Sequence, residues 1–163
     1  MQLLSRFAKG WTTRMYAAVP VLALLTVAGS PPRGEPARPV VADTTVTIRT
    51  FGANLAFEPD RISLKQGLTV RVRYVNESTL GHNFVIVRAD DDIDVLGKAS
   101  HEAAATGYVP MQHKDRIIGY SALASPGQTV EFTFVVPPPG EYPFVCLVDG
   151  HYNMMLGTLR SRP

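Results

Sequence analysis

Apolar and polar residues alternate in short runs over most of the chain after residue 42, which is the pattern of β-strands buried on one face. In the run "LTVRVRYVNE" at 68–77, the apolar Val70, Val72 and Tyr74 are separated by arginines. We predict further strands at 44–51, within 57–67, and at 82–89, 128–137, 141–148 and 155–161. Turn signals rich in proline and glycine lie between these runs. Many short strands with such turns predict an all-β fold, a Greek-key β-sandwich.

The segment 90–107 interrupts this alternation. It begins with aspartates and is rich in alanine, and carboxylates near the N-terminus of a helix stabilise the helix. We therefore predict one short helical insertion that packs on the outside of the sandwich. The next segment, 108–120, is predicted to loop back into a strand. The acidic run at 90–94 lacks the glycine and the terminal glutamate of a calcium-binding loop, so we interpret it as a solvated helix start.

The N-terminus has the order of features of a secretory signal. Arg6, Lys9 and Arg14 precede an apolar run at 15–29, and small residues end that run. The run is shorter than the ~20 residues of a membrane-spanning helix. We predict an exported protein, periplasmic or otherwise extracytoplasmic, that is membrane-anchored only if this segment stays uncleaved. The predicted parts of the chain are a signal peptide or N-terminal anchor at 1–30, a proline-rich linker at 31–42 and a folded domain at 43–163.

Charge and cysteine content narrow the possible functions. The formal net charge is +2, and the lysines and arginines are scattered singly along the chain. Nucleic-acid binding is therefore excluded as a function class, because it requires clustered positive charge. The one cysteine, Cys146, has no partner for an internal disulfide. In an oxidising compartment such a thiol has to be buried or bound.

The side chains around this cysteine are ligands that soft metal ions prefer. Cys146 ends a predicted strand, His151 lies in the loop that follows, and Met155 begins the next strand. His82 lies in a distant apolar run and would connect this loop to the sandwich. Two histidines and one cysteine with a weak axial methionine make up a type 1, or blue, copper site. We therefore predict one copper ion held by four ligands: His82, Cys146, His151 and Met155.

Other residues of the same types compete for these roles. Met154 competes with Met155, but the spacing and the following Gly-Thr favour Met155. A lone buried cysteine or histidine is more often part of a core than a ligand, and the sequence neighbours of the predicted ligands argue against that interpretation. His101 and His113 are interpreted as solvated or structural. Zinc accepts the same cysteine and histidine ligands, and its binding would reflect metal availability.

Two motifs resemble those of the cupredoxins, in particular the azurin and auracyanin branch. The first is "GHNFVI" at 81–86. The second is the series Cys146, four residues, His151, three residues and Met155, followed by "LGTL". The interval between the two motifs is long enough for the helical insertion of azurin-like chains. The resemblance covers about 44–160.

The resemblance implies a role for each residue of the two motifs. His82, Cys146 and His151 would be the equatorial copper ligands, and Met155 would be the axial ligand. The carbonyl oxygen of Gly81 would make a weak additional contact.

It also implies roles for residues that do not bind the ion. Asn83 would brace the loop of the cysteine through hydrogen bonds. Electrons would enter and leave at the edge of His151, through an apolar patch made up of Leu80, Val148, Tyr152 and Met154. The chain departs from the family at Asp149, where azurins often have proline, and in lacking the family's disulfide.

Together these features predict an electron carrier rather than an enzyme. Copper oxidases and nitrite reductases need further histidine clusters, and this chain has 4 histidines and no His-x-His pair. We expect a monomer that carries single electrons between redox partner proteins by Cu(I)/Cu(II) cycling, through small and transient contacts. The alternative is a copper-binding or copper-delivery protein without an electron-transfer role.

Overall fold

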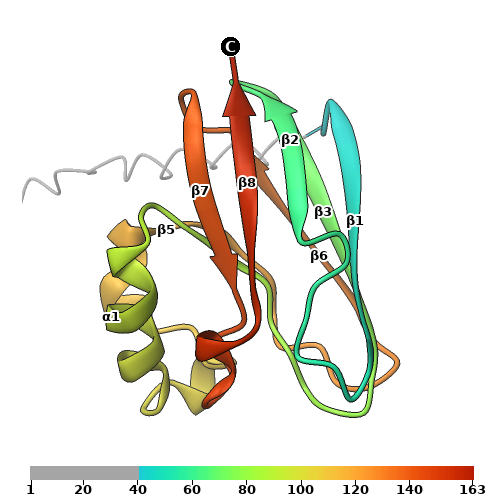
Figure 1. Cartoon of the computed structure of the whole chain (residues 1–163), viewed down its shortest axis with the longest axis vertical. Coiled ribbons are helices and arrows are strands. Elements are labelled where there is room, and N and C mark those ends of the chain that lie inside the picture. The colour runs from blue at the N-terminus through green and yellow to red at the C-terminus, as the bar shows by residue number, and fades with distance from the viewer. Residues whose placement is uncertain (1–40) are drawn as a thin grey trace, which may run out of the picture. The chain divides into compact units, whose positions relative to one another are not determined.

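The computed structural model describes residues 41–163, which form a sandwich of two β-sheets with a short α-helix beside it (Figure 1). This confirms the predicted all-β sandwich with a helical insertion. The predicted signal or anchor at 1–30 lies outside the described residues, as does the linker up to residue 40. Within 41–163, every helix is too short or too polar to cross a membrane.

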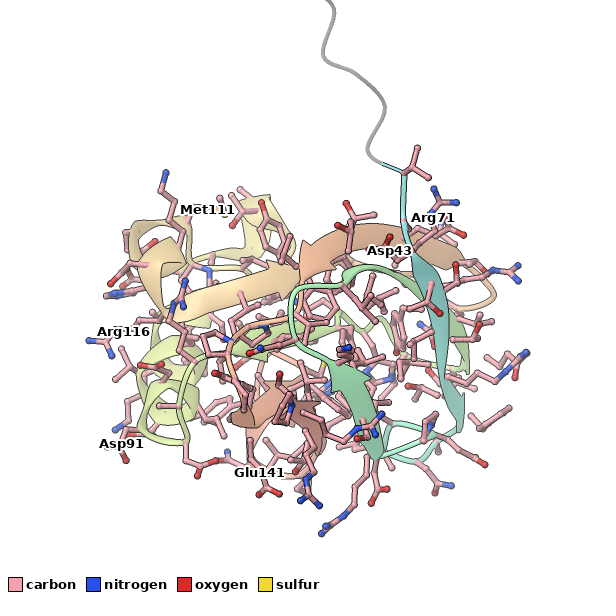
Figure 2. The ribbon with its side chains drawn as sticks, turned by 90° about the horizontal axis from the view of Figure 1, so that it is seen from above. Asp43, Arg71, Asp91, Met111, Arg116 and Glu141 are labelled. Carbon is pink, nitrogen blue, oxygen red and sulfur yellow. The ribbon has the colours of Figure 1, made fainter. Side chains whose placement is uncertain are left out.

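The smaller sheet shows the alternation that the sequence predicts. It contains, in spatial order, β1 (Thr44–Gly52), β3 (Thr69–Ser78) and β6 (Thr129–Val135). β3 pairs in parallel with β1 and antiparallel with β6. Val70, Val72 and Tyr74 are fully buried, while Arg71 and Arg73 point outward and lie near Glu131 of β6. Figure 2 shows the outward side chains of charged residues such as Arg71 and Glu141 around the edge of the domain.

The larger sheet brings two of the predicted ligands side by side. Its spatial order is β2 (Arg61–Lys65), β8 (Leu156–Arg162), β7 (Gly140–Val145), β4 (Val85–Val87) and β5 (Ile117–Tyr120). Because β7 and β8 are antiparallel neighbours, the end of β7 lies beside the start of β8. The backbone N–H of Cys146, directly after β7, donates to the carbonyl of Met155, directly before β8, at 3.1 Å.

The helical insertion covers part of the outer face of the larger sheet. Helix α1 (Asp91–Ser100) has three aspartates in its first turn and packs Leu96 into a cluster with Val85, Val145 and Leu147. Figure 1 shows α1 beside β5 and the end of β7. Short 3-10 helices follow: η1 (Ala104–Thr106), η2 (Met111–Arg116) and, after β7, η3 (His151–Asn153).

Aromatic side chains fill the space between the two sheets. Phe57 packs edge-on against Tyr74, Phe84 and Phe144, with ring centroids 5.1–5.9 Å apart. Edge-to-face pairs of this kind add to the free energy gained by burying the rings. Cys146 belongs to the same buried cluster, so the predicted metal ligands lie at one end of a rigid core.

The strand predicted at 82–89 is shorter in the structure, since β4 covers only Val85–Val87. Before it, His82 makes an isolated bridge with Ala124. The backbone N–H of Phe84 donates to the side-chain hydroxyl of Ser121 at 3.0 Å instead of to a neighbouring strand. A side-chain hydrogen bond therefore replaces one sheet hydrogen bond at Phe84, although its carbonyl still accepts from the backbone N–H of Ser121. Alternation alone does not reveal this.

Candidate metal centre

Three of the predicted ligands meet at one end of the sandwich. The Sγ atom of Cys146 lies 3.7 Å from Nδ1 of His82 and 3.6 Å from Nδ1 of His151. The candidate ligand atoms of the three residues all lie within 4.8 Å of one another. Among residues 41–163, this is the one group of three or more histidine, cysteine or acidic side chains with such spacing.

The loop after β7 presents the second histidine to the cysteine. Gly150 has a φ of 78°, a left-handed conformation that is accessible to glycine at little cost. The chain therefore reverses direction just before η3, which begins with His151. The backbone N–H of His151 donates to the carbonyl of Val148 at 2.9 Å and closes this turn. The side chain of His151 thus faces back toward Cys146.

The two candidate methionines lie in different environments. Met155 is fully buried in the same core cluster as Cys146, and its backbone N–H donates to the carbonyl of His151 at 2.8 Å. Met154 is 64% exposed. This placement agrees with the choice of Met155 over Met154, although its role as axial ligand stays a prediction, like the contact of the Gly81 carbonyl.

Asn83 connects the cysteine loop to the helical insertion. Its side chain is fully buried, and Oδ1 accepts a hydrogen bond from the backbone N–H of Leu147 at 2.7 Å. Its Nδ2 donates to the carbonyl of Gly107 at 2.8 Å. These are the hydrogen bonds that the predicted bracing role requires, and one of them ends on the residue next to Cys146.

Burial keeps the three candidate ligands neutral in the metal-free protein. Burial outweighs the opposing effect of backbone hydrogen bonds from Asn83 and Val148 and raises the pKa of the Cys146 thiol to about 11. Burial, together with a smaller effect of the nearby His151, lowers the pKa of His82 to about 4. The pKa of His151 is lowered by burial too, with Asp149 acting in the opposite direction. A metal ion that binds as a thiolate complex therefore displaces one proton from Cys146.

The hydrogen bonding of His82 also fits a metal ligand. Within the described part of the chain, its Nε2 atom is buried without a hydrogen-bond partner, and its Nδ1 atom faces the sulfur atom of Cys146. A buried imidazole with its hydrogen-bonding capacity unused costs free energy. A soft metal ion bound at Nδ1 would not give Nε2 a partner, but it would use the nitrogen lone pair that faces the sulfur atom of Cys146, and two imidazoles with a thiolate suit copper.

These pKa shifts predict that the metal-free protein loses stability in mild acid. Between pH 6.5 and about 4 the unfolded chain binds a proton at His82 that the folded protein does not, so the free energy of unfolding falls as the pH falls through this window. We expect this contribution to be about 2–3 kcal/mol at most. Urea unfolding at pH 7 and pH 4.5 measures this contribution. The His82→Gln variant is the reference, because its pH dependence contains the effect of the carboxylates but not that of His82. An equal pH dependence in both proteins would contradict the prediction.

The predicted electron-entry patch is unevenly exposed. Leu80 is 46% exposed and Met154 lies open to solvent, whereas Val148 and Tyr152 are half-buried. The ring of Tyr152 packs on the backbone of α1 at Gly97, where a Cβ atom would lie only 2.4 Å from the ring. Tyr152 therefore holds the helical insertion against the ligand loop in addition to any role in the patch.

Some contacts of the site are not evident from the sequence. His101, interpreted as solvated or structural, lies just after α1 with its Nδ1 atom 2.5 Å from Oδ1 of Asp149 in the ligand loop. In the acidic run, Asp92 is buried and pairs with Arg116 at 2.5 Å, so part of that run is structural. His113 lies in η2 and is not part of the metal-binding group. No motif in the sequence signals these pairs, because they depend on how the insertion packs.

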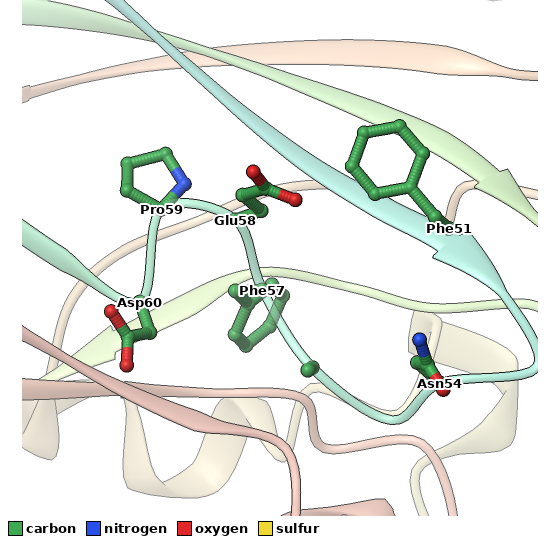
Figure 3. A pocket seen from close by; sticks show the side chains of 7 residues that line it. Phe51, Asn54, Phe57, Glu58, Pro59 and Asp60 are labelled. Atoms are coloured by element: carbon green, nitrogen blue, oxygen red, sulfur yellow. The ribbon is translucent and has the colours of Figure 1, made fainter.

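A hollow on the surface lies apart from these residues. It has a volume of about 300 Å³, lies in the connection from β1 to β2, and is lined by residues between Phe51 and Asp60 (Figure 3). The carboxylates of Glu58 and Asp60 point apart in this view, and the lining contains no histidine or cysteine. The hollow therefore does not offer a second site for a soft metal ion.

Known proteins share both the sequence pattern and the fold. The model of the family described as copper binding proteins, plastocyanin/azurin family, matches residues 44–161. Auracyanin-B of Chloroflexus aurantiacus is 32% identical over 151 residues, which are 90% of this chain and 64% of auracyanin-B. Auracyanin-A of the same bacterium is 34% identical over 118 residues, which are 71% of this chain and 72% of auracyanin-A. The solved structure of auracyanin A, a "blue" copper protein, gives a TM-score of 0.69 at 35% identity and covers 72% of this chain and 98% of that chain.

A further relative points to a different use of copper. The copper-resistant cuproprotein CopI of Pseudomonas aeruginosa is 28% identical over 151 residues, which are 80% of this chain and 82% of CopI. The relatives therefore include both blue copper proteins and a protein of copper resistance.

Proposed function

Because the chain belongs to the plastocyanin/azurin family of copper-binding proteins, we propose that it carries single electrons between redox partner proteins. The observation that carries this proposal is the buried group of His82, Cys146 and His151, in which both Nδ1 atoms face the sulfur atom. One copper ion, when bound there, supplies a one-electron couple between Cu(II) and Cu(I).

In this proposal the chain's own residues fix the shape of the site. His82, Cys146 and His151 would hold the copper ion, and Met155 and the Gly81 carbonyl would make weaker contacts with it. The backbone turn before His151 and the hydrogen bonds of Asn83 hold these ligands through contacts that do not involve a metal. A site braced in this way changes little between two oxidation states, and small rearrangement favours fast electron transfer.

Access to the site is through the second histidine. His82 and Cys146 are fully buried, while His151 is half-buried and so is the one ligand of the three that is partly open to solvent. The exposed apolar side chains of Leu80 and Met154 belong to the proposed patch around this histidine. A small apolar patch suits a brief contact with a partner protein, followed by release.

We propose a carrier without catalytic activity, because the four predicted ligands would leave no open coordination position on the copper ion for a substrate. The second candidate function is copper binding or delivery, which the similarity to the copper-resistant cuproprotein CopI favours. Ion delivery requires ligands that exchange readily with a partner, and two of the three ligands here are completely buried. This burial favours electron transfer over delivery.

The proposed location follows from the N-terminal sequence. The apolar run at 15–29 behind three positive charges supports export, with the domain at 43–163 acting as a monomer outside the cytoplasm. Membrane attachment would require that this run stay in the mature protein.

The proposed function predicts a blue protein. One equivalent of Cu(II) added to the purified metal-free protein is expected to give an intense thiolate-to-copper absorption band and a narrow copper hyperfine splitting in the EPR spectrum. The reason is that a buried thiolate bound to copper together with two imidazoles would share its electron density strongly with the ion. The bound copper should also exchange electrons rapidly and reversibly at an electrode.

Ordinary, pale Cu(II) spectra would overturn the electron-transfer proposal. Fast transfer of the ion to a chelator, with no reversible redox wave, would favour the copper-delivery function instead.

A further inference from the structure

Asn76 lies near the end of β3 and uses all of its side-chain hydrogen-bonding capacity inside the protein. It is fully buried. Its two Nδ2 hydrogens go to the carbonyls of Leu80 and Ala124, at 2.7 and 2.8 Å. Its Oδ1 accepts from the backbone N–H and the hydroxyl of Ser78, at 3.0 and 2.6 Å. An amide with two donor hydrogens and one oxygen has no further bond to offer here.

The two carbonyls that Asn76 binds belong to the segments on either side of His82. Leu80 is two residues before it in the chain, and Ala124 is its bridge partner. The backbone N–H of His82 donates to the Ala124 carbonyl at 3.1 Å, and the Ala124 N–H donates to the His82 carbonyl at 2.8 Å. The carbonyl of Ala124 is thus shared between His82 and Asn76.

This support matters because the sheet does not hold His82. The histidine makes only an isolated bridge, and β4 begins three residues later at Val85. Apart from the two backbone hydrogen bonds between His82 and Ala124, the backbone here is held by side-chain hydrogen bonds. Asn76 is fully buried, and its side chain joins Leu80, two residues before His82, to Ala124, the residue that bridges to His82.

We propose that Asn76 is a positioning residue that fixes the backbone of His82 and thereby aims its Nδ1 atom at the metal. This inference rests on the proposed copper site and adds a residue that does not touch the ion. The side chain acts through backbone carbonyls, whereas Asn83 acts on the cysteine loop. The two asparagines therefore brace different ligands.

The Asn76→Asp variant tests the inference most directly. It keeps the shape of the side chain but replaces two N–H donors with a carboxylate that faces two carbonyl oxygens. We expect Cu(I) affinity, measured by competition with a chelator, to fall by about 10-fold or more, as for other groups that orient metal ligands. We also expect altered EPR hyperfine splitting, and faster hydrogen exchange of the His82 and Ala124 amides in the metal-free protein.

The matched control is Ser161→Ala at the far end of β8. Ser161 is also buried and donates one hydrogen bond, to the carbonyl of Pro137 at 2.7 Å. Its loss should lower stability while copper affinity and the EPR spectrum stay unchanged. If Asn76→Asp does not fold, Ser78→Ala replaces it, because the one hydroxyl hydrogen of Ser78 lies within reach of Asn76 Oδ1 at 2.6 Å and of the Leu80 carbonyl at 3.0 Å. That variant should shift the same measurements in the same direction by a smaller amount.

Copper affinity and spectra of Asn76→Asp equal to those of the unaltered protein would overturn the inference, as would equal effects of Ser161→Ala. Failure of the proposed function has a different signature, because the unaltered protein itself would then give no blue copper spectrum. The amide exchange of His82 is measured without metal, so unchanged exchange in the Asn76 variant refutes the positioning role in that case also.

Discussion

The Cys146→Ser variant is expected to lose the blue absorption band completely. The band requires a thiolate bound to copper, and Cys146 is the one cysteine of the chain. A serine hydroxyl is not ionised at neutral pH and is a poor ligand for soft ions. Loss of groups that merely support metal ligands costs 10–100-fold in affinity. We therefore expect loss of this ligand to weaken Cu(I) binding by more than about 100-fold.

Absorption spectroscopy and chelator competition measure this result, and circular dichroism of the metal-free variant shows whether the fold is retained. The matched control is Met154→Leu, which removes an exposed thioether from the same loop. That variant should keep the band and the affinity. A blue Cys146→Ser protein, or a colourless Met154→Leu protein, would show that the ligands are assigned wrongly.

The sequence brings three of the four predicted ligands together because these three are organised locally. Cys146, His151 and Met155 come from one short loop between two strands whose alternation is clear. A strand, a turn and a second antiparallel strand necessarily return the chain to its starting point, so the spacing alone brings these residues together. The buried state of Met155 and the exposed state of Met154 follow from the same alternation.

The supports of the site are harder to predict, because they join residues far apart in the sequence. Asn76 binds the carbonyl of Ala124, and His101 meets Asp149 across the helical insertion. An asparagine before a loop is ordinary in any sequence, since this residue is common in turns. Only the packing of β3 against the segment at Ala124 distinguishes Asn76 from such residues. The short length of β4 is not evident from the sequence for the same reason, because the backbone N–H of Phe84 donates to the side chain of the distant Ser121.

The Gly157→Ala variant is expected to be strongly destabilised. Gly157 lies in β8, two residues after Met155 and opposite Phe144 in β7. A methyl group there would lie 2.0 Å from the ring of Phe144 and 2.5 Å from the carbonyl oxygen of Asp60. The ring is fully buried, and the carbonyl is held by the backbone N–H of Thr158 at 2.8 Å, so neither can move freely. We expect a loss of about 3 kcal/mol in the free energy of unfolding, the upper end of overpacking costs.

Urea unfolding of the metal-free protein measures this loss, with Gly81→Ala as the matched control. A methyl group on Gly81 would lie 3.6 Å from its nearest neighbour, in the side chain of Leu123, which is an ordinary contact. That variant should change the free energy of unfolding by less than about 1 kcal/mol. Similar stabilities of the two variants would mean that β7 and β8 can separate at little cost. A close fit at Gly157 predicts the opposite, because its pairing with Phe144 lies two residues along the same β7–β8 ladder from the hydrogen bond between Cys146 and Met155.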